Sequence, residues 1–417
     1  MTSKVVSAIR AAIILLMITL SLYAEREGLY IKEFHRYLLV ELFAVAIITI
    51  LFFPGPGQLK SIKVDWLAMA FCTGLALYTL ASDLFVDKQF RFAGAGVFVV
   101  LFLAGYTVLK KNSWHCYLRD FEIAVQAFLL ILIAASVLFP VQSRVPGRYS
   151  GPIENPSVYA LYLCAVWAVL LGRLESQINN KERSAGLFFS TIELFATLIL
   201  MILSQSLTPM IAMAAVTFLW FFRMVMIRKG ARYAVKLFFV IGLLLILALA
   251  VLILLIRVNG IGGESRIVQK LQSADISAFL SGRDYYWHKY LRELNVFGHK
   301  TKPFLWDHRI LPHNAIIGMA YMYGVPCVIP YILMMMMAIE KSFRFANTSV
   351  NNASIPFYCI VSFVIMSMAD NVEQPFVWLP WIACYLMMAP ILIMPVEEIE
   401  ALKKVNTDIC AKEPEQI

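Results

Sequence analysis

The sequence predicts an all-helical membrane protein with about twelve transmembrane helices. Hydrophobic residues make up 60% of the chain and charged residues 15%, whereas soluble domains are about half apolar and about one quarter charged. Apolar runs of roughly 17–25 residues also recur along the chain, each long enough to cross a hydrocarbon core of about 30 Å. Each run must be helical, because lipid offers backbone amides no hydrogen-bond partner.

The apolar runs define the expected spans. They cover 6–24, 37–54, 64–82, 92–109, 121–140, 157–174, 185–203, 209–227, 234–256, 313–337, 353–369 and 376–394. The first run resembles a signal peptide, but no A-x-A-like cleavage site follows it, so we expect a retained helix. The division at Ser204–Pro209 decides the count, because one broken span over 185–227 would invert the topology after it.

The distribution of basic residues predicts the orientation. If both termini are cytoplasmic, the segments on that side, counted with the span ends, hold 20 Lys and Arg, and the opposite short loops hold 7. Basic residues in short loops favour the cytoplasmic side. We therefore expect a multi-pass protein of the cytoplasmic membrane, with loop 257–312 outside. The net charge of +9 then reflects topology, and no nucleic-acid partner is expected.

Residue spacing favours neither disulfides nor a metal. The seven cysteines are scattered through apolar runs without a CxxC or other ligand spacing. No H-x-x-x-H spacing and no outer Asp-x-Asp pair is present either. The sequence therefore predicts no metal and no cofactor.

Loop 257–312 is long for a connection between spans and has helical patterning. Ser281 is a suitable N-cap, and the stripe that follows is Trp287, Tyr290, Leu291 and Leu294. The stretch over 266–280 has a weaker version of this pattern. We expect two short helices on the outer membrane face, although a simple lid over the bundle is an equal alternative.

Arginines on the outer side are informative because the orientation rule does not explain them. Arg144 and Arg148 lie in loop 141–156, and Arg266 and Arg283 lie in the long loop. A guanidinium group binds phosphate oxygens bidentately, so several converging arginines would hold a pyrophosphate and stabilise it as a leaving group. The alternative is contact with lipid headgroups or nearby carboxylates.

His313 stands where the long loop becomes a membrane helix, next to Asn314. An imidazole can act as a general base toward a sugar hydroxyl. The alternative is an interfacial histidine with hydrogen-bonded neighbours. Asp370 lies in a short acidic loop on the same side and could orient His313 or an arginine, unless this loop is a plain turn. Glu41, Glu122 and Glu193 fall within or near spans without a partner pattern, so we assign them no role.

Taken together, these motifs resemble the O-antigen ligase and polysaccharide polymerase family of membrane glycosyltransferases. The resemblance covers about residues 140–395. Its motifs, in chain order, are Arg148-Tyr-Ser-Gly151, Glu154-Asn155-Pro156, Ser281-Gly-Arg283 with Trp287, Phe297-Gly298-His299, Pro312-His313-Asn314 with Tyr323-Gly324, and Asp370-Asn371.

The resemblance implies a fold and an activity. It implies a GT-C-like bundle with an N-terminal part over 1–140, a ligase- or polymerase-like domain over 141–395 and a cytoplasmic tail over 396–417. Such proteins transfer a glycan from a polyprenyl-pyrophosphate-linked donor to a glycan or lipid acceptor outside the cytoplasmic membrane, with inversion and without a metal. Polymerase is favoured over ligase, because no segment resembles an element that docks a lipid core.

The resemblance also implies residue roles. His313 would deprotonate the acceptor hydroxyl, and Asp370 would orient it. The residues expected to bind the pyrophosphate or the glycan are Arg148, Arg266, Arg283, Asn155, Asn314, Trp287 and Arg144. This sequence departs from the family at Leu207, which stands where members carry a basic residue, so another arginine must supply that contact, Arg144 or Arg257 among them.

The alternative function is a flippase or transporter of the lipid-linked oligosaccharide. It predicts polar residues in the middle of the membrane, or an internal repeat with paired broken helices. The sequence contains no convincing repeat, and its polar cluster lies in outer loops.

Overall fold

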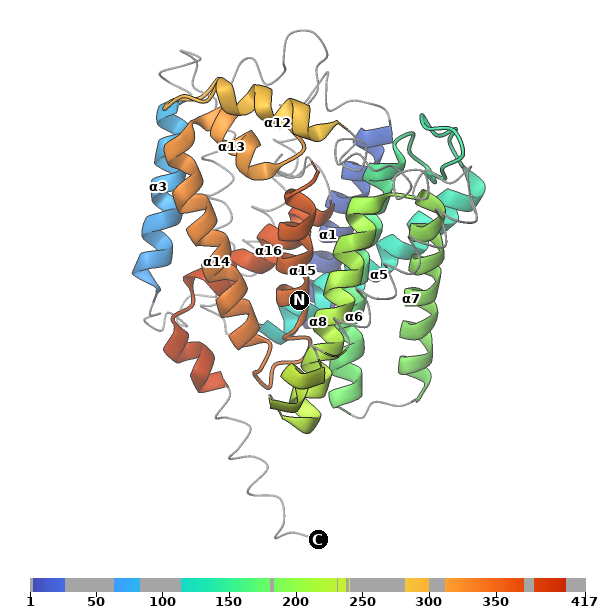
Figure 1. Ribbon diagram of the computed structural model, residues 1–417. Coiled ribbons are helices and arrows are strands. Elements are labelled where there is room, and N and C mark those ends of the chain that lie inside the picture. Colours follow the sequence, from blue (N-terminus) through green and yellow to red (C-terminus); the bar gives the residue numbers. More distant parts are fainter. Residues whose placement is uncertain are drawn as a thin grey trace.

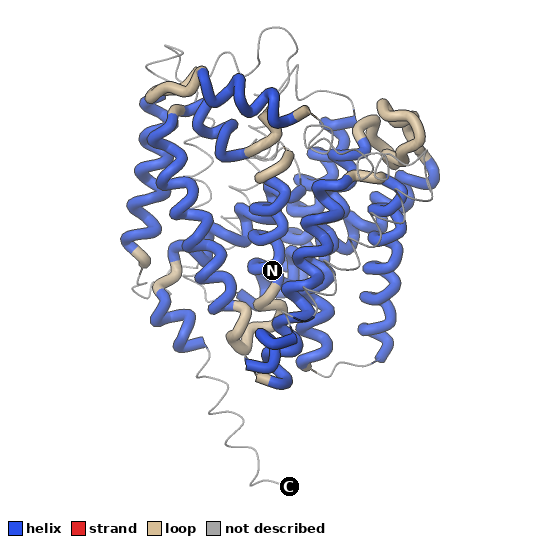
Figure 2. Tube along the Cα trace, viewed as in Figure 1, coloured by secondary structure: helices blue, strands red, loops and turns tan. Residues whose placement is uncertain are grey.

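The computed structural model describes residues 3–26, 64–82, 114–180, 184–230, 232–237, 240, 282–299, 312–370 and 379–402. Every regular element in these ranges is a helix (Figures 1 and 2). The α-helices include α1 (Ser3–Arg26), α3 (Trp66–Ser82), α5 (Trp114–Leu138), α6 (Pro156–Asn179), α7 (Ser184–Ser204), α8 (Leu207–Lys229), α12 (Arg283–Arg292), α13 (Ala315–Tyr323), α14 (Val328–Phe345), α15 (Ile355–Ser367) and α16 (Leu379–Ile393). A short 3-10 helix, η2, covers Val325–Cys327. Residues 232–237 and 396–402 are also helical.

The all-helical fold is confirmed for these residues. Five helical segments are long and apolar enough to cross a membrane: Trp114–Leu138, Pro156–Asn179, Ala185–Ser204, Leu207–Lys229 and Val325–Phe345. Shorter apolar helices lie within the expected spans 6–24, 64–82, 353–369 and 376–394. The expected spans 37–54 and 92–109, and most of 234–256, lie outside the described residues. The count of twelve therefore stays a prediction.

The division between the seventh and eighth expected spans is confirmed. Helix α7 ends at Ser204 and α8 begins at Leu207, with Ser206 as its N-cap. Gln205 between them has a φ of +48°, which no helix interior adopts. Pro209 lies in the first turn of α8, where its missing N–H costs no hydrogen bond. The chain therefore reverses direction here.

The expected span 313–337 is wrong as a single helix. The chain forms α13, breaks at Gly324, and continues through η2 into α14, so the apolar crossing is Val325–Phe345. Gly324 has a φ of +100°, and a Cβ built on it would lie 1.8 Å from the carbonyl oxygen of Val296. A Cβ on Gly298 would likewise lie 2.2 Å from the carbonyl oxygen of Met322. The segment 295–299 thus packs backbone against backbone on the break, which only glycine permits.

We expect Gly324→Ala to lower the free energy of unfolding by about 3 kcal/mol or more. The new methyl group meets the Val296 carbonyl oxygen, which cannot rotate away, and the alanine must adopt a φ that is strained for any residue other than glycine. Thermal unfolding of the protein in detergent measures this change. Gly74→Ala is the matched control, since nothing lies within 4 Å of a Cβ at Gly74 on α3. An unfolding midpoint for Gly324→Ala equal to that of the control would contradict the close approach at the break.

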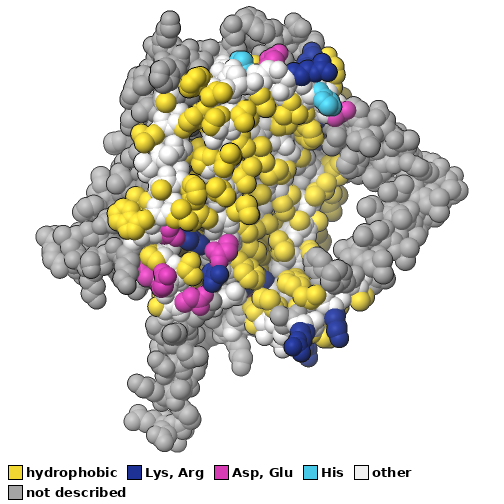
Figure 3. All heavy atoms as spheres, turned by 60° about the vertical axis from the view of Figure 1, so that its left-hand side comes forward, with side chains coloured by type: hydrophobic (Ala, Val, Ile, Leu, Met, Phe, Trp, Pro, Cys, Tyr) yellow, Lys and Arg dark blue, Asp and Glu magenta, His cyan; other side chains and the backbone are white. Residues whose placement is uncertain are grey.

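Helix α6 forms the centre of the bundle. In its most apolar window 83% of the residues are buried, against 22% for α7 and 28% for α8. It packs against α5, α7, α8, α15 and α16. Helix α7 exposes Phe188, Phe189 and Phe195. Figure 3 shows another face of the bundle, the one on the left of Figure 1, with hydrophobic side chains across its middle and charged side chains toward its two ends. That distribution suits a lipid-facing surface.

The segments predicted to share the outer side do lie at one end of the described bundle. Helices α12 and α13, the loop 141–155, the α7–α8 turn and the end of α15 lie together at the top of Figure 1. The C-terminal ends of α6 and α14 lie at the other end. Within loop 257–312, the structure describes residues 282–299 and Pro312. The second expected short helix, over 266–280, lies outside the described residues.

Candidate functional site

His313 lies between the long loop and α13 and is held from two sides. Its Nδ1 is 3.2 Å from Oδ1 of Asp370, which follows the end of α15. The indole Nε1 of Trp287 on α12 donates a hydrogen bond of 2.6 Å to the carbonyl oxygen of Pro312. The backbone of His313 has a φ of +49°, which is uncommon for a residue other than glycine. Strained residues of this kind are often found at functional sites.

The contact with Asp370 sets what the imidazole can do. The His313 side chain is 35% exposed and the Asp370 side chain 8% exposed. In a neutral imidazole, donation of the Nδ1–H to the carboxylate leaves Nε2 as the proton acceptor. The partly exposed ring then carries a base at Nε2, and a buried carboxylate fixes the orientation of the ring.

Arg283 reaches the same place from the first turn of α12. Its Nη1 donates to Oγ1 of Thr208 at 3.3 Å and to the carbonyl oxygen of Ala369, the neighbour of Asp370. Its Nε and Nη2 have no hydrogen-bond partner among the described residues. Helix α12 begins one residue later than expected, with Gly282 as its N-cap at a φ of +74°, so the expectation of Ser281 as the N-cap is wrong. Glycine adopts this left-handed conformation without steric cost.

Arg148 lies against the other side of the α7–α8 turn. Its Nε donates to the carbonyl oxygen of Ser204 at 2.7 Å, and its Nη2 lies 3.5 Å from Oγ of Ser157. Arg148 and Arg283 therefore contact the beginning and the end of one short turn. Leu207 directly follows this turn as the first residue of α8. The basic side chains that reach the turn come from a loop and from α12. Arg144, one of the two substitutes suggested by the sequence, does not contact it in any described interaction, and Arg257, the other, lies outside the described residues.

Three other expected binding residues have partners within the chain. Arg144 forms an ion pair of 2.5 Å with Glu154 on the surface. Asn155 caps α6 by accepting from the Ser157 N–H. Asn314 caps α13 by accepting from the Ile317 N–H and also donates to the Met368 carbonyl oxygen at 2.9 Å. These contacts account for the three side chains as structural supports of the site, whereas Arg266 lies outside the described residues.

The expected apolar stripe of α12 does not form one buried face. Tyr290 is buried and packs edge-to-face on Tyr321 of α13, with ring centroids 4.6 Å apart. Leu291 is 49% exposed, and Leu294 lies beyond the helix end at Arg292. The aromatic pair thus holds α12 on α13, which places Trp287 and Arg283 near His313.

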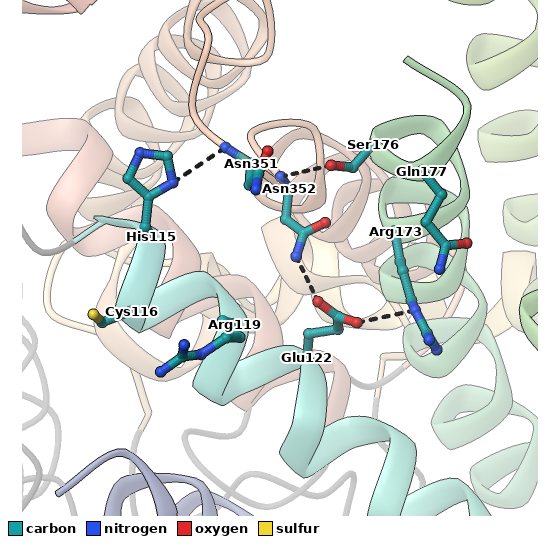
Figure 4. Close-up of a pocket in the computed structure, with 9 residues that line it drawn as sticks. All are labelled: His115, Cys116, Arg119, Glu122, Arg173, Ser176, Gln177, Asn351 and Asn352. Atoms are coloured by element: carbon teal, nitrogen blue, oxygen red, sulfur yellow. Dashed lines mark hydrogen bonds and ion pairs between the residues drawn. The ribbon is translucent and has the colours of Figure 1, made fainter. Parts of the chain in front are cut away.

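The structure also pairs two carboxylates to which the sequence assigned no role. Arg173 on α6 lies 3.0 Å from Glu122 on α5 and 2.9 Å from Glu193 on α7 (Figure 4 shows the first contact). Gln126 on α5 donates to Glu193 at 3.1 Å. Ionisable residues within spans were the available signal, but their partner comes from a third helix, which spacing along the chain does not reveal.

Comparison with models of known protein families and with curated proteins gives no match for this chain. The site is therefore interpreted from its geometry, together with the motif order of the sequence.

Proposed function

We propose that the protein is a membrane glycosyltransferase of the O-antigen ligase or polymerase type, which acts on the outer face of the cytoplasmic membrane. It transfers a glycan from a polyprenyl-pyrophosphate-linked donor to a sugar hydroxyl. The observation that carries this proposal is the placement of an Asp370-oriented His313 beside Arg283. A base and a phosphate-binding group are the two functions that such a transfer requires of the protein.

The reaction is a single displacement at the anomeric carbon. Nε2 of His313 takes the proton of the acceptor hydroxyl as its oxygen attacks the anomeric carbon. The bond between that carbon and the pyrophosphate oxygen breaks, and its electron pair leaves with the polyprenyl pyrophosphate. Arg283, with Arg148 on the other side of the α7–α8 turn, stabilises the negative charge on the leaving group. The configuration at the anomeric carbon inverts, and the step uses no metal or cofactor.

The acceptor in this proposal is a second lipid-linked repeat unit, which makes the protein a repeat-unit polymerase of a surface polysaccharide. A ligase would use a lipid or glycan acceptor with the same chemistry.

The decisive experiment uses the purified full chain in vesicles with a defined polyprenyl-pyrophosphate oligosaccharide. We expect glycans longer than the donor, together with free polyprenyl pyrophosphate. Donor movement across the vesicle membrane with no new glycosidic bond would overturn the proposal.

That second outcome belongs to the alternative function, a flippase of the lipid-linked oligosaccharide. One observation favours it: the pairing of Glu122, Arg173 and Glu193 on three apolar helices, because charged groups inside spans often mark a transport path. A flippase requires this network for donor movement, whereas the transferase does not require it for bond formation. Glu193→Gln in the same vesicles separates the two, since only the flippase loses its activity through that change.

A further inference from the structure

A polar pocket lies at the end of the bundle away from His313, between the start of α5, the end of α6 and the loop 346–354 (Figure 4). It has a volume of about 330 Å³ and is lined by side chains that include His115, Arg119, Glu122, Arg173, Gln177 and Asn351. Pockets of roughly this size hold small ligands, and a polar lining selects a polar one.

The one carboxylate among the described lining residues, Glu122, is already occupied. Oε1 of Glu122 lies 3.0 Å from Arg173, and Oε2 accepts a hydrogen bond from the Asn352 side chain. Figure 4 shows both partners turned toward this carboxylate. Because Arg173 is shared with Glu193 at 2.9 Å, its charge is also used within the protein. The glutamate therefore does not act as the group that receives a ligand.

Hydrogen-bond donors, in contrast, remain available in the pocket. Gln177 is only 4% exposed, and its Oε1 accepts from Ser190 at 2.8 Å. Its amide nitrogen has no partner among the described residues, and Figure 4 shows it on the side toward Arg173. The nitrogen is not enclosed, since the fully buried side-chain atoms without a partner in the described part of the chain are Nε1 of Trp220 and Nε of Arg223.

Two further donors lie around the pocket. Arg119 donates through Nη2 to Oγ of Ser7 at 2.9 Å, which leaves its Nε and Nη1 without partners in the described part of the chain. The side-chain oxygen of Asn351 accepts from Asn180 at 2.8 Å, which leaves its amide hydrogens available. The pocket therefore offers one guanidinium and two amides, and all three are donors.

We infer that this pocket binds a phosphodiester that carries a small polyhydroxyl group, of the size and charge of a phosphoglycerol headgroup. The donors select an oxyanion, and a guanidinium fits phosphate oxygens. Arg119 keeps two guanidinium nitrogens for a ligand, and its charge is partly offset by Asp120 at 3.6 Å, so a ligand with one negative charge fits better than one with two. The pocket volume of about 330 Å³ equals that of about ten water molecules in the liquid, which is more than a bare phosphate requires. The same chemistry occurs in a lipid headgroup and in a free glycerophosphodiester.

Cys116 provides a direct readout, because it lines the pocket and is partly exposed, while the other five described cysteines are buried. The experiment measures the rate of maleimide labelling of the full chain with Cys410→Ser, in micelles of an uncharged maltoside detergent. One arm adds phosphatidylglycerol, a second adds glycerophosphoglycerol, and a third adds diacylglycerol, which has no phosphodiester. At a ligand concentration ten times Kd we expect labelling to slow about tenfold, because only unoccupied protein reacts.

The arms identify the source of the phosphodiester. Slower labelling in the first arm alone assigns the pocket to a membrane lipid, and slower labelling in the second arm assigns it to a headgroup that binds without its acyl chains. Equal rates in all three arms would overturn the inference, as would equal slowing by diacylglycerol.

Variants test the residues. Arg119→Gln removes the charged donor and is expected to weaken protection about tenfold, since a hydrogen bond from a charged group is lost. Gln177→Glu places a carboxylate of nearly the same size in the pocket. We expect this change to abolish the protection of Cys116 from labelling. Arg228→Gln, an exposed arginine near the end of α8 and outside the lining, is the matched control and should keep full protection. Full protection in both Arg119→Gln and Gln177→Glu would overturn the assignment.

Discussion

His313→Asn is expected to lower the rate of glycan transfer by about 10²–10⁴-fold, the usual contribution of a general base. Asparagine tolerates the φ of +49° at this position, so the backbone geometry is retained while the proton acceptor is lost. The measurement is the rate of product formation from a defined lipid-linked donor, at matched protein levels in vesicles. Donor affinity is expected to change little, because the proposed pyrophosphate contacts come from arginines.

The matched control is His288→Gln, because His288 is an exposed histidine on α12 and forms no described contact with His313. Its transfer rate should equal that of the unmodified protein. Asp370→Asn adds an independent test of the orientation, since an amide in place of the carboxylate weakens the hold on Nδ1 and should reduce the rate by less than the loss of His313 does. A His313→Asn protein with full transfer activity would contradict the role of this residue as base.

The apolar spans were predictable because their length is set by the membrane and not by tertiary contacts. The run 157–174 and the helix α6 differ only at their ends, where Asn155 caps the helix and polar residues extend it to Asn179. The turn at Gln205 was also predictable, because Pro209 at the start of the second run restricts where a helix can continue. Local rules therefore determine much of this part of the fold.

The break at Gly324 was not predictable from apolar length. Residues 313–337 are apolar enough for one span, and the event that divides them is the approach of the Val296 carbonyl oxygen from a distant part of the chain. A glycine in an apolar run indicates that a backbone approaches closely, but it does not indicate whether a helix or a loop approaches. Only the tertiary arrangement distinguishes these cases.

The candidate site shows the same division between local and distant information. His313 could be singled out because it stands at the entry to a membrane helix, but its contact with Asp370 joins residues 57 positions apart. Arg283 was suggested by its residue type, whereas its partners Thr208 and the Ala369 carbonyl oxygen come from two other helix ends. Sequence reasoning therefore proposed the chemical groups, and the fold determines which of them meet.

The role proposed for Arg283 depends on the shape of its side chain and not only on its charge. One nitrogen of the guanidinium holds both Thr208 and the Ala369 carbonyl oxygen, while the planar group keeps other N–H donors directed elsewhere. A lysine at this position keeps the charge but has a single nitrogen, so it cannot hold the helix ends and receive a pyrophosphate with the same geometry. The substitution therefore separates geometry from charge.

We expect Arg283→Lys to lower kcat/KM for the lipid-linked donor by about tenfold to hundredfold, because a charge-assisted hydrogen bond contributes about 1.5–3 kcal/mol. Arg292→Lys, at the exposed end of the same helix, is the control and should leave kcat/KM unchanged. If the arginine acts on the leaving group, the loss appears in kcat as well as in KM, since the negative charge on the pyrophosphate grows as the glycosidic bond breaks. An unchanged kcat/KM in Arg283→Lys would show that charge alone is sufficient at this position and would remove the guanidinium geometry from the mechanism.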